Sequence, residues 1–112
     1  MIDNYKFGEL TFNGKKYTED LVISHGEVSK WDVADHHFPQ KEDIAEILEG
    51  KPEYLIIGRG SSSSMEISEE LREFIQDKGI KFLALPTAAA AQKYNQLWIE
   101  QKDVAAFLHL TC

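Results

Sequence analysis

One stretch decides the fold of this chain: residues 54–79, which read YLIIGRGSSSSMEISEELREFIQDKG. It opens with a short apolar run at 54–57, which two glycines around Arg59 and then four serines follow. Residues 69–78 have apolar side chains at helical spacing and end at Gly79. A strand, a glycine loop and a helix in this order are typical of α/β proteins, which often bind small ligands at the carboxyl ends of their strands.

The rest of the C-terminal half continues this alternation. Residues 80–85 and 104–110 are near-continuous apolar runs, which are typical of strands that are covered on both faces. Alternating strands and helices from residue 54 onward predict a mainly parallel sheet with right-handed crossovers. Helices are predicted at 40–49, 68–78 and 87–101, and strands at 54–57, 80–85 and 104–110.

The N-terminal half has a different character. Residues 5–23 predict a β-hairpin, because Asn13-Gly14 favours the type I′ turn and apolar residues flank it on both sides. Residues 24–38 follow neither the strand nor the helix period, which predicts a long irregular connection with room for one short strand. Connections of this length are often functional.

These elements predict a single α/β domain over residues 1–112, with three layers, a mixed and mainly parallel central sheet, and an N-terminal β-hairpin. A length of 112 residues is sufficient for one domain with one real core. The residues predicted to be buried are Ile56, Ile57, Leu71, Phe74, Ile75, Phe82, Leu83, Tyr94, Phe107 and Leu108.

Composition narrows the function classes. A net charge of −7 argues against binding to nucleic acid, because a phosphate backbone attracts basic proteins. No apolar run approaches the roughly 20 residues of a membrane span, and the N-terminus lacks the pattern of a signal peptide. We therefore expect a cytoplasmic protein that does not bind membranes. The single cysteine, Cys112, allows neither an internal disulfide nor a thiolate metal cluster.

The glycine loop is the first candidate binding site. Its backbone amides and the charge of Arg59 favour a small anion, either a phosphate or a carboxylate. However, a dinucleotide fingerprint needs a third glycine where Ser63 stands, and the Gly-Lys-Ser/Thr ending of a phosphate loop is absent. An anion site and a plain structural turn are both compatible with the pattern, and the turn is favoured. The candidate ligand-binding residues are Gly58, Arg59, Gly60, Ser61, Ser62 and Ser63.

Two further kinds of chemistry are disfavoured. Imidazoles and carboxylates gather within residues 24–38, but adjacent histidines cannot easily chelate one ion and no His-x-x-x-His pair occurs, so neither a metal site nor a cofactor is predicted. Cys112 and His109 would point to opposite faces of a strand. The serines lack a Gly-x-Ser-x-Gly elbow. No catalytic residue is therefore predicted.

The sequence predicts different environments for the two tryptophans. Trp98 falls on one helical face with Ala91 and Tyr94, which predicts core packing. Trp31 lies in the irregular segment and is predicted to contact a partner, because aromatic side chains are enriched among the anchors of interfaces. The net charge favours a neutral or basic partner. The predicted partner-binding residues are Trp31, His36, His37 and Phe38.

Four short motifs in the C-terminal half add a resemblance. They are Ile-Ile-Gly-Arg-Gly at 56–60, Gly-Ile at 79–80, Lys-Tyr-Asn at 93–95 and His-Leu-Thr-Cys at 109–112. In this order and spacing they resemble the small-protein family that includes the human adipogenesis-associated domain protein and a mitochondrial complex I assembly factor. The resemblance is strong over residues 52–112 and looser over 1–51.

This resemblance implies one compact domain with a mixed central sheet, no established enzymatic activity, and roles in assembly or regulation through other proteins. It carries no catalytic residue over to this chain. The favoured prediction is a non-enzymatic interaction or assembly module that binds another protein or a second copy of itself. The alternative is a small-anion binding protein, or an enzyme, that uses the loop at Gly58, Arg59 and Gly60.

Overall fold

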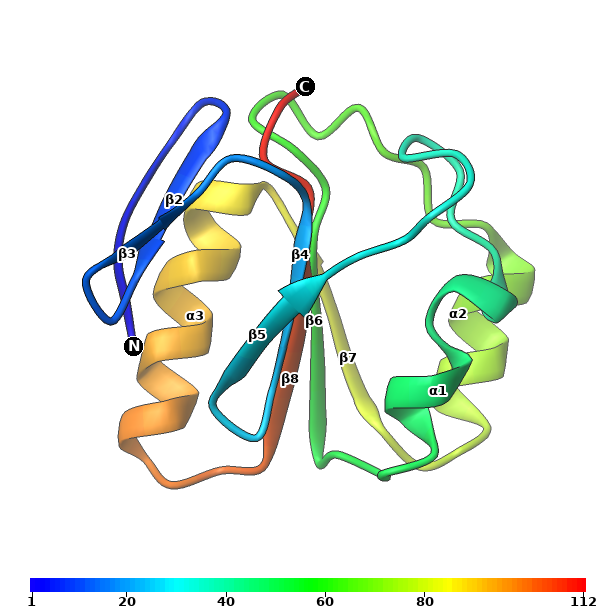
Figure 1. Cartoon of the computed structure of the whole chain (residues 1–112). Helices are drawn as coiled ribbons and strands as arrows, with labels where there is room; N and C mark the ends of the chain where they lie inside the picture. Colours follow the sequence, from blue (N-terminus) through cyan, green and yellow to red (C-terminus); the bar gives the residue numbers. More distant parts are fainter.

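The computed structural model describes residues 1–112, and a five-stranded sheet lies at its centre (Figure 1). The strand order is β5-β4-β8-β6-β7. β6 is parallel to both of its neighbours, β7 and β8, whereas β4 is antiparallel to both β5 and β8. The strands are β4 (Leu21–Ser24), β5 (Glu27–Lys30), β6 (Tyr54–Gly58), β7 (Lys81–Leu85) and β8 (Val104–Leu108).

The prediction of a mixed sheet is confirmed, but the sheet is not mainly parallel. Only the three strands from the alternating C-terminal half run parallel, and the β4–β5 hairpin adds an antiparallel edge. His25 and Gly26 form the hairpin turn with φ values of 52° and 75°, a conformation typical of tight two-residue turns. The short strand allowed for within residues 24–38 is β5.

The predicted hairpin over residues 5–23 is replaced by a separate three-stranded antiparallel sheet. Its strands are β1 (Ile2–Lys6), β2 (Glu9–Phe12) and β3 (Lys15–Tyr17). Asn13-Gly14 does form the expected tight turn, between β2 and β3. The single hairpin was wrong because the chain also turns at Gly8, with a φ of 78°, and because β4 leaves to pair with β8.

Three helices and one 3₁₀ turn connect these strands. They are η1 (Lys41–Asp43), α1 (Ala45–Leu48), α2 (Glu69–Gln76) and α3 (Thr87–Ile99). The helix predicted at 40–49 is divided, because Ile44 leaves helical geometry with a φ of −125° and a ψ of −10°. α2 begins as predicted, since the Ser68 side chain accepts a hydrogen bond from the Leu71 amide at 3.0 Å.

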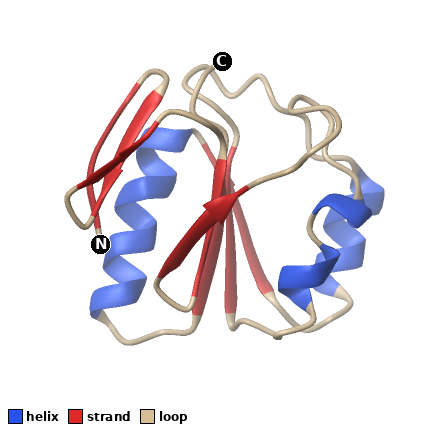
Figure 2. Ribbon diagram, viewed as in Figure 1, coloured by secondary structure: helices blue, strands red, loops and turns tan.

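Two apolar clusters cover the two faces of the central sheet. α3 and the N-terminal sheet lie on one face, and α1 and α2 lie on the other (Figure 2). Successive residues of one strand divide between the clusters: Ile56 belongs to the first, and Leu55 and Ile57 belong to the second. This alternation explains why the strands read as continuous apolar runs.

Seven of the ten residues predicted to be buried have at most 1% of their surface exposed. The other three, Phe74, Phe82 and Leu83, are half-buried. Phe82 and Leu83 belong to β7, which is an edge strand of the sheet and therefore lacks a neighbour on one side. A periodic sequence pattern does not distinguish an edge strand from a central one.

Candidate functional site

The glycine loop that follows β6 is occupied by the chain itself. The amides of Ser62 and Ser64 both donate to the main-chain oxygen of Cys112, and the Ser61 amide donates to that of Thr111. Figure 1 shows the red C-terminal end lying beside the green loop. The remaining amides from residue 59 to 65 also donate to oxygen atoms within the chain.

These bonds remove the main argument for an anion site at residues Gly58 to Ser63. An anion at such a loop needs free backbone N–H groups, and from residue 59 to 65 none is free. The Arg59 Nε also donates within the chain, to the Met65 carbonyl at 2.8 Å. The geometry therefore favours the structural turn that the sequence left open beside the anion site.

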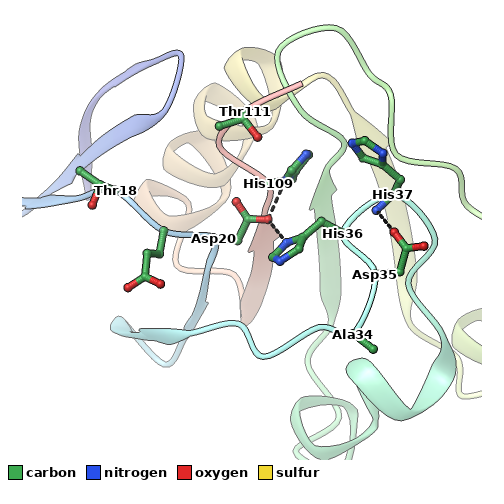
Figure 3. A pocket seen from close by; sticks show the side chains of 9 residues that line it. Thr18, Asp20, Ala34, Asp35, His36, His37, His109 and Thr111 are labelled. Atoms are coloured by element: carbon green, nitrogen blue, oxygen red, sulfur yellow. Dashed lines mark hydrogen bonds and ion pairs between the residues drawn. The ribbon is translucent and has the colours of Figure 1, made fainter.

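A polar pocket with a volume of about 590 Å³ opens near this loop (Figure 3). Asp20 lies at its centre, and its side chain is 7% exposed. The Asp20 Oδ2 atom lies 2.5 Å from His36 Nδ1 and 2.6 Å from His109 Nδ1. The other carboxylate oxygen accepts a hydrogen bond from the Leu110 amide at 2.8 Å. The lining residues include Thr18, Asp20, Asp35, His36, His37 and His109.

The sheet topology brings Asp20 and His109 together. Asp20 directly precedes β4, and His109 directly follows β8. Because these strands are antiparallel with Leu21 opposite Leu108, the preceding and following residues come side by side. His36 arrives from the irregular segment after β5 (Figure 3). The three side chains, from distant parts of the sequence, thus form one cluster, which we call the Asp20 cluster.

Sequence reasoning missed this cluster. In the sequence, His36 lies beside His37, and His109 lies near Cys112, far from Asp20. Asp20 and His109 are 89 positions apart, and the pairing of β4 with β8 leaves no local signal in the sequence. A histidine and an aspartate at the ends of two apolar strands were the available clue, since the ends of adjacent strands meet at one edge of a sheet.

The protonation pattern of the Asp20 cluster follows from its hydrogen bonds. A carboxylate only accepts, so each imidazole donates from Nδ1, and in a neutral ring this leaves Nε2 with a lone pair. The His109 Nε2 is buried and has no hydrogen-bond partner. The His37 ring stands edge-on to His109 at 5.7 Å between centroids. In this arrangement the Nε2 atoms keep their lone pairs, whereas both oxygens of Asp20 already accept hydrogen bonds.

Tyr5 lies at the edge of the same region. Its hydroxyl donates to the Leu110 carbonyl at 2.9 Å. Burial raises the pKa of Tyr5, a hydrogen bond with Ser61 lowers the pKa, and the negative charge of Asp20 raises it further. The net shift is upward, so the phenol remains neutral and remains a hydrogen-bond donor at neutral pH.

The predicted partner-binding residues do not stay together at the surface. His36 and His37 are exposed beside the pocket, and Phe38 is 49% exposed. Trp31, by contrast, is only 3% exposed and packs on Phe107 with ring centroids 5.0 Å apart. Its Nε1 donates to the Asp43 carbonyl. The expectation that Trp31 lies at the surface is therefore wrong.

Trp98 is partly exposed at the surface, although the sequence predicted that it packs in the core. It is 40% exposed, because Leu97 instead of Trp98 continues the buried stripe of α3 below Tyr94. Trp98 stacks on Tyr94 at 6.2 Å with an interplanar angle of 13°. With Met1 and Ile99 it lines a shallow hollow of about 540 Å³. We call these three residues, Met1, Trp98 and Ile99, the apolar patch.

Comparison with known families shows to which family this chain belongs. Residues 2–109 match the family described as "Protein of unknown function (DUF498/DUF598)". The chain belongs to this family. The resemblance inferred from the four short motifs is thereby confirmed.

Solved structures share the fold of this chain. A conserved hypothetical protein from Pyrococcus horikoshii OT3 superposes with a TM-score of 0.88 at 22% identity, covering 100% of this chain and 99% of that one. A protein named MT938 gives 0.83 at 29% identity, with 100% and 98% covered. A Bordetella pertussis protein described as a Mth938-like domain gives 0.72 at 21% identity, with 97% and 84% covered. The fold is thus Mth938-like.

The family description assigns no function. The helices in the structure are too short or too polar to cross a bilayer. The cytoplasmic location expected from the sequence stays a prediction.

Proposed function

We propose that this Mth938-like domain is a non-enzymatic module that binds another protein through the apolar patch. The observation that carries the proposal is the exposure of large apolar side chains at one place: Trp98 is 40% exposed, Ile99 64% and Met1 39%. Clustered exposed apolar residues of this kind mark interaction sites, whereas single ones do not. A tryptophan is also among the residues that most often dominate binding energy.

The patch is arranged for binding at low entropic cost. The Trp98 ring is held by stacking on Tyr94, and its edge lies against the turn at Gly26, where a Cβ would come within 2.9 Å of the ring. A side chain that is already immobile loses little freedom when a partner covers it. The adjoining hollow, of about 540 Å³, has room for an apolar side chain of the partner.

The expected partner is a neutral or basic protein with an exposed apolar side chain. The net charge of −7 repels acidic surfaces over long distances and attracts basic ones. Two copies of this chain would each carry that charge, which opposes self-association. His36, His37 and Phe38 remain predicted contact residues on a separate part of the surface, where His36 and His37 line the polar pocket and Phe38 follows them in the chain.

Two matched variants test the proposal. Ile99 and Phe7 are both 64% exposed, and Phe7 lies in the turn between β1 and β2. Replacing either residue with aspartate adds the same charge at an equally exposed position. We expect Ile99→Asp to reduce capture of one specific protein from an extract of the native host at least tenfold, read by mass spectrometry. Phe7→Asp should capture that protein as the wild type does.

Equal capture by Ile99→Asp and the wild type would reject the apolar patch as the contact surface. Sedimentation equilibrium of the purified wild type and both variants distinguishes a second copy from a different partner. A wild-type dimer that Ile99→Asp converts to a monomer would show that the patch serves self-association. Thermal unfolding of both variants checks that the fold is intact.

The alternative function at the glycine loop finds no specific support in the geometry, since the loop amides bind the C-terminal residues. A thermal-shift screen with phosphates and carboxylates tests it directly. An anion that binds there and is present at a concentration 100 times its Kd would add about 2.7 kcal/mol to the free energy of unfolding. Only a shift that Arg59→Ala abolishes would restore this alternative.

A further inference from the structure

We infer that the Asp20 cluster is a binding site for one divalent transition-metal ion of the zinc type. Asp20, His36 and His109 each present one potential ligand atom, and these atoms lie within 4.8 Å of one another. Two imidazole nitrogens and one carboxylate oxygen form a ligand set that suits Zn²⁺, Cu²⁺ or Ni²⁺. The calcium and magnesium ions, which prefer oxygen ligands throughout, fit this set poorly.

The burial of the cluster distinguishes it from chance proximity at a surface. The side chains of Asp20 and His109 are only 7% and 5% exposed. Burying a carboxylate is costly unless charge and hydrogen bonds compensate. The His109 Nε2 is nevertheless left without a partner, whereas buried polar atoms in purely structural networks are nearly always satisfied. Because Nε2 is unpaired, moving the ring proton from Nδ1 to Nε2 frees Nδ1 for a metal ion without breaking a hydrogen bond at Nε2.

Supporting contacts hold the two buried ligands in place. The Leu110 amide binds one oxygen of Asp20 at 2.8 Å, so the other oxygen stays directed at both imidazoles. Such outer contacts orient the ligands of natural metal sites. If a metal ion binds His109 Nδ1, the ring proton moves to Nε2, and the His37 ring lies edge-on to His109 with the centroids 5.7 Å apart.

A metal ion needs slightly more space than the present hydrogen bonds leave. The nitrogen–oxygen distances are 2.5 Å and 2.6 Å, whereas tetrahedral bonds of about 2.0–2.1 Å separate ligand atoms by about 3.3 Å. His36 can supply the movement, since its side chain is 47% exposed and it lies in the irregular segment after β5. The buried pair, Asp20 and His109, must also separate slightly by rotation of the two side chains.

Three protein ligands leave the fourth position of a tetrahedral ion to water or to an added ligand. The pocket beside the cluster, of about 590 Å³, gives that position access to solvent. The carboxylates of Glu19 and Asp35 also line the pocket and add negative charge that attracts a cation. The site is thus open on one side, as in metal centres that exchange ligands.

Isothermal titration of the chelator-treated full chain with ZnCl₂ tests the inference, and Co²⁺ absorption spectra report the coordination. We expect one ion per chain, with affinity at least 100-fold weaker in His36→Gln and in His109→Gln. His36→Gln is the decisive variant, because its side chain is half exposed and the core does not depend on it. Thermal unfolding without metal confirms that each variant folds.

A histidine outside the pocket provides the control. His25 is exposed in the turn at the other end of β4. His25→Gln should bind the ion within about threefold of the wild type. The assignment fails if the wild type binds no Zn²⁺, or if folded His36→Gln binds as tightly as the wild type. It also fails if His25→Gln abolishes binding.

Discussion

Gly60 carries the most demanding backbone conformation in the glycine loop. Its φ is +102°, and a Cβ added there would lie 2.2 Å from the backbone carbon of Cys112. Gly79, in the turn after α2, also has a positive φ, of +75°, but nothing lies within 4 Å of its Cβ position. Replacing Gly79 therefore tests backbone strain alone, whereas replacing Gly60 tests backbone strain together with a steric clash.

We expect Gly79→Ala to lower the free energy of unfolding by about 1 kcal/mol, from backbone strain alone. Gly60→Ala should cost at least about 2 kcal/mol more, because the C-terminal residues must move and the amides of the loop lose their partners. Urea denaturation of both variants measures the difference. Equal losses would contradict the close approach of the C-terminus to the loop.

Burial shifts the pKa of Tyr94 upward. The residue has no exposed surface, and its hydroxyl has no hydrogen-bond partner. Burial raises the pKa of Tyr94 from 10.0 to about 12. In the unfolded chain the phenol loses its proton near pH 10, whereas in the folded chain it keeps the proton until about pH 12. The folded state therefore binds more protons over this range, so stability falls as pH rises.

Tyr94→Phe should remove the loss of stability that ionisation of this phenol causes at alkaline pH. At pH 8 the variant should be as stable as the wild type, or more stable, because an unsatisfied buried hydroxyl disappears. At pH 11 its advantage should grow by about 1 kcal/mol. Urea denaturation of both proteins at the two pH values measures this change, and the comparison cancels the titration of other groups. An unchanged difference would show that the phenol is not desolvated.

Among the elements, α2 owes its start to one side chain. Ser68 Oγ accepts from the Leu71 amide, and Glu69 and Glu70 follow in the first turn. Ser68→Ala should lower the free energy of unfolding by about 1 kcal/mol. Ser62→Ala is a suitable control, since Ser62 is exposed and only its backbone amide forms a hydrogen bond. If both variants lost the same stability, the cap would contribute nothing specific.

Elements with strong local signals could be predicted from the sequence. Ser68 marked the start of α2, and Asn13-Gly14 marked a true turn. Gly79 lies in the turn that follows the last residue of α2, Gln76. The errors arose where long-range pairing decides the outcome. β4 pairs with β8, although apolar spacing alone suggested that residues 21–23 return along the first hairpin. Local propensity contains no information about a partner strand so distant in the sequence.

The same limit applies to the candidate sites. Trp31 follows no periodic pattern, yet its side chain fills the core against Phe107. Trp98 follows the helical pattern, yet Leu97 takes the buried position. Asp20 and His109 meet only because the antiparallel register of β4 and β8 places them together. Each outcome depends on tertiary packing, which overrides the local pattern.

At the scale of the whole molecule, the N-terminal sheet is a separate unit that α3 holds in place. Figure 1 shows it beside α3 and apart from the central sheet. Asn95 of α3 makes a paired contact with β1: its Oδ1 accepts from the Ile2 amide at 2.9 Å, and its Nδ2 donates to the Ile2 carbonyl at 2.8 Å. Asn95 thus provides for β1 the pair of hydrogen bonds that a neighbouring strand would provide.

Asn95→Ala should therefore loosen the N-terminal sheet before the rest of the fold. Losing both bonds leaves the partly buried backbone groups of Ile2 unpaired, which costs about 1–3 kcal/mol. Hydrogen exchange read by mass spectrometry should show faster exchange in residues 1–17, with β6 and β8 unchanged, because local opening needs less free energy than global unfolding. Gln96→Ala is the control, since that side chain bonds only to the exposed Glu100. Faster exchange throughout the central sheet would instead mean that the two sheets unfold as one cooperative unit.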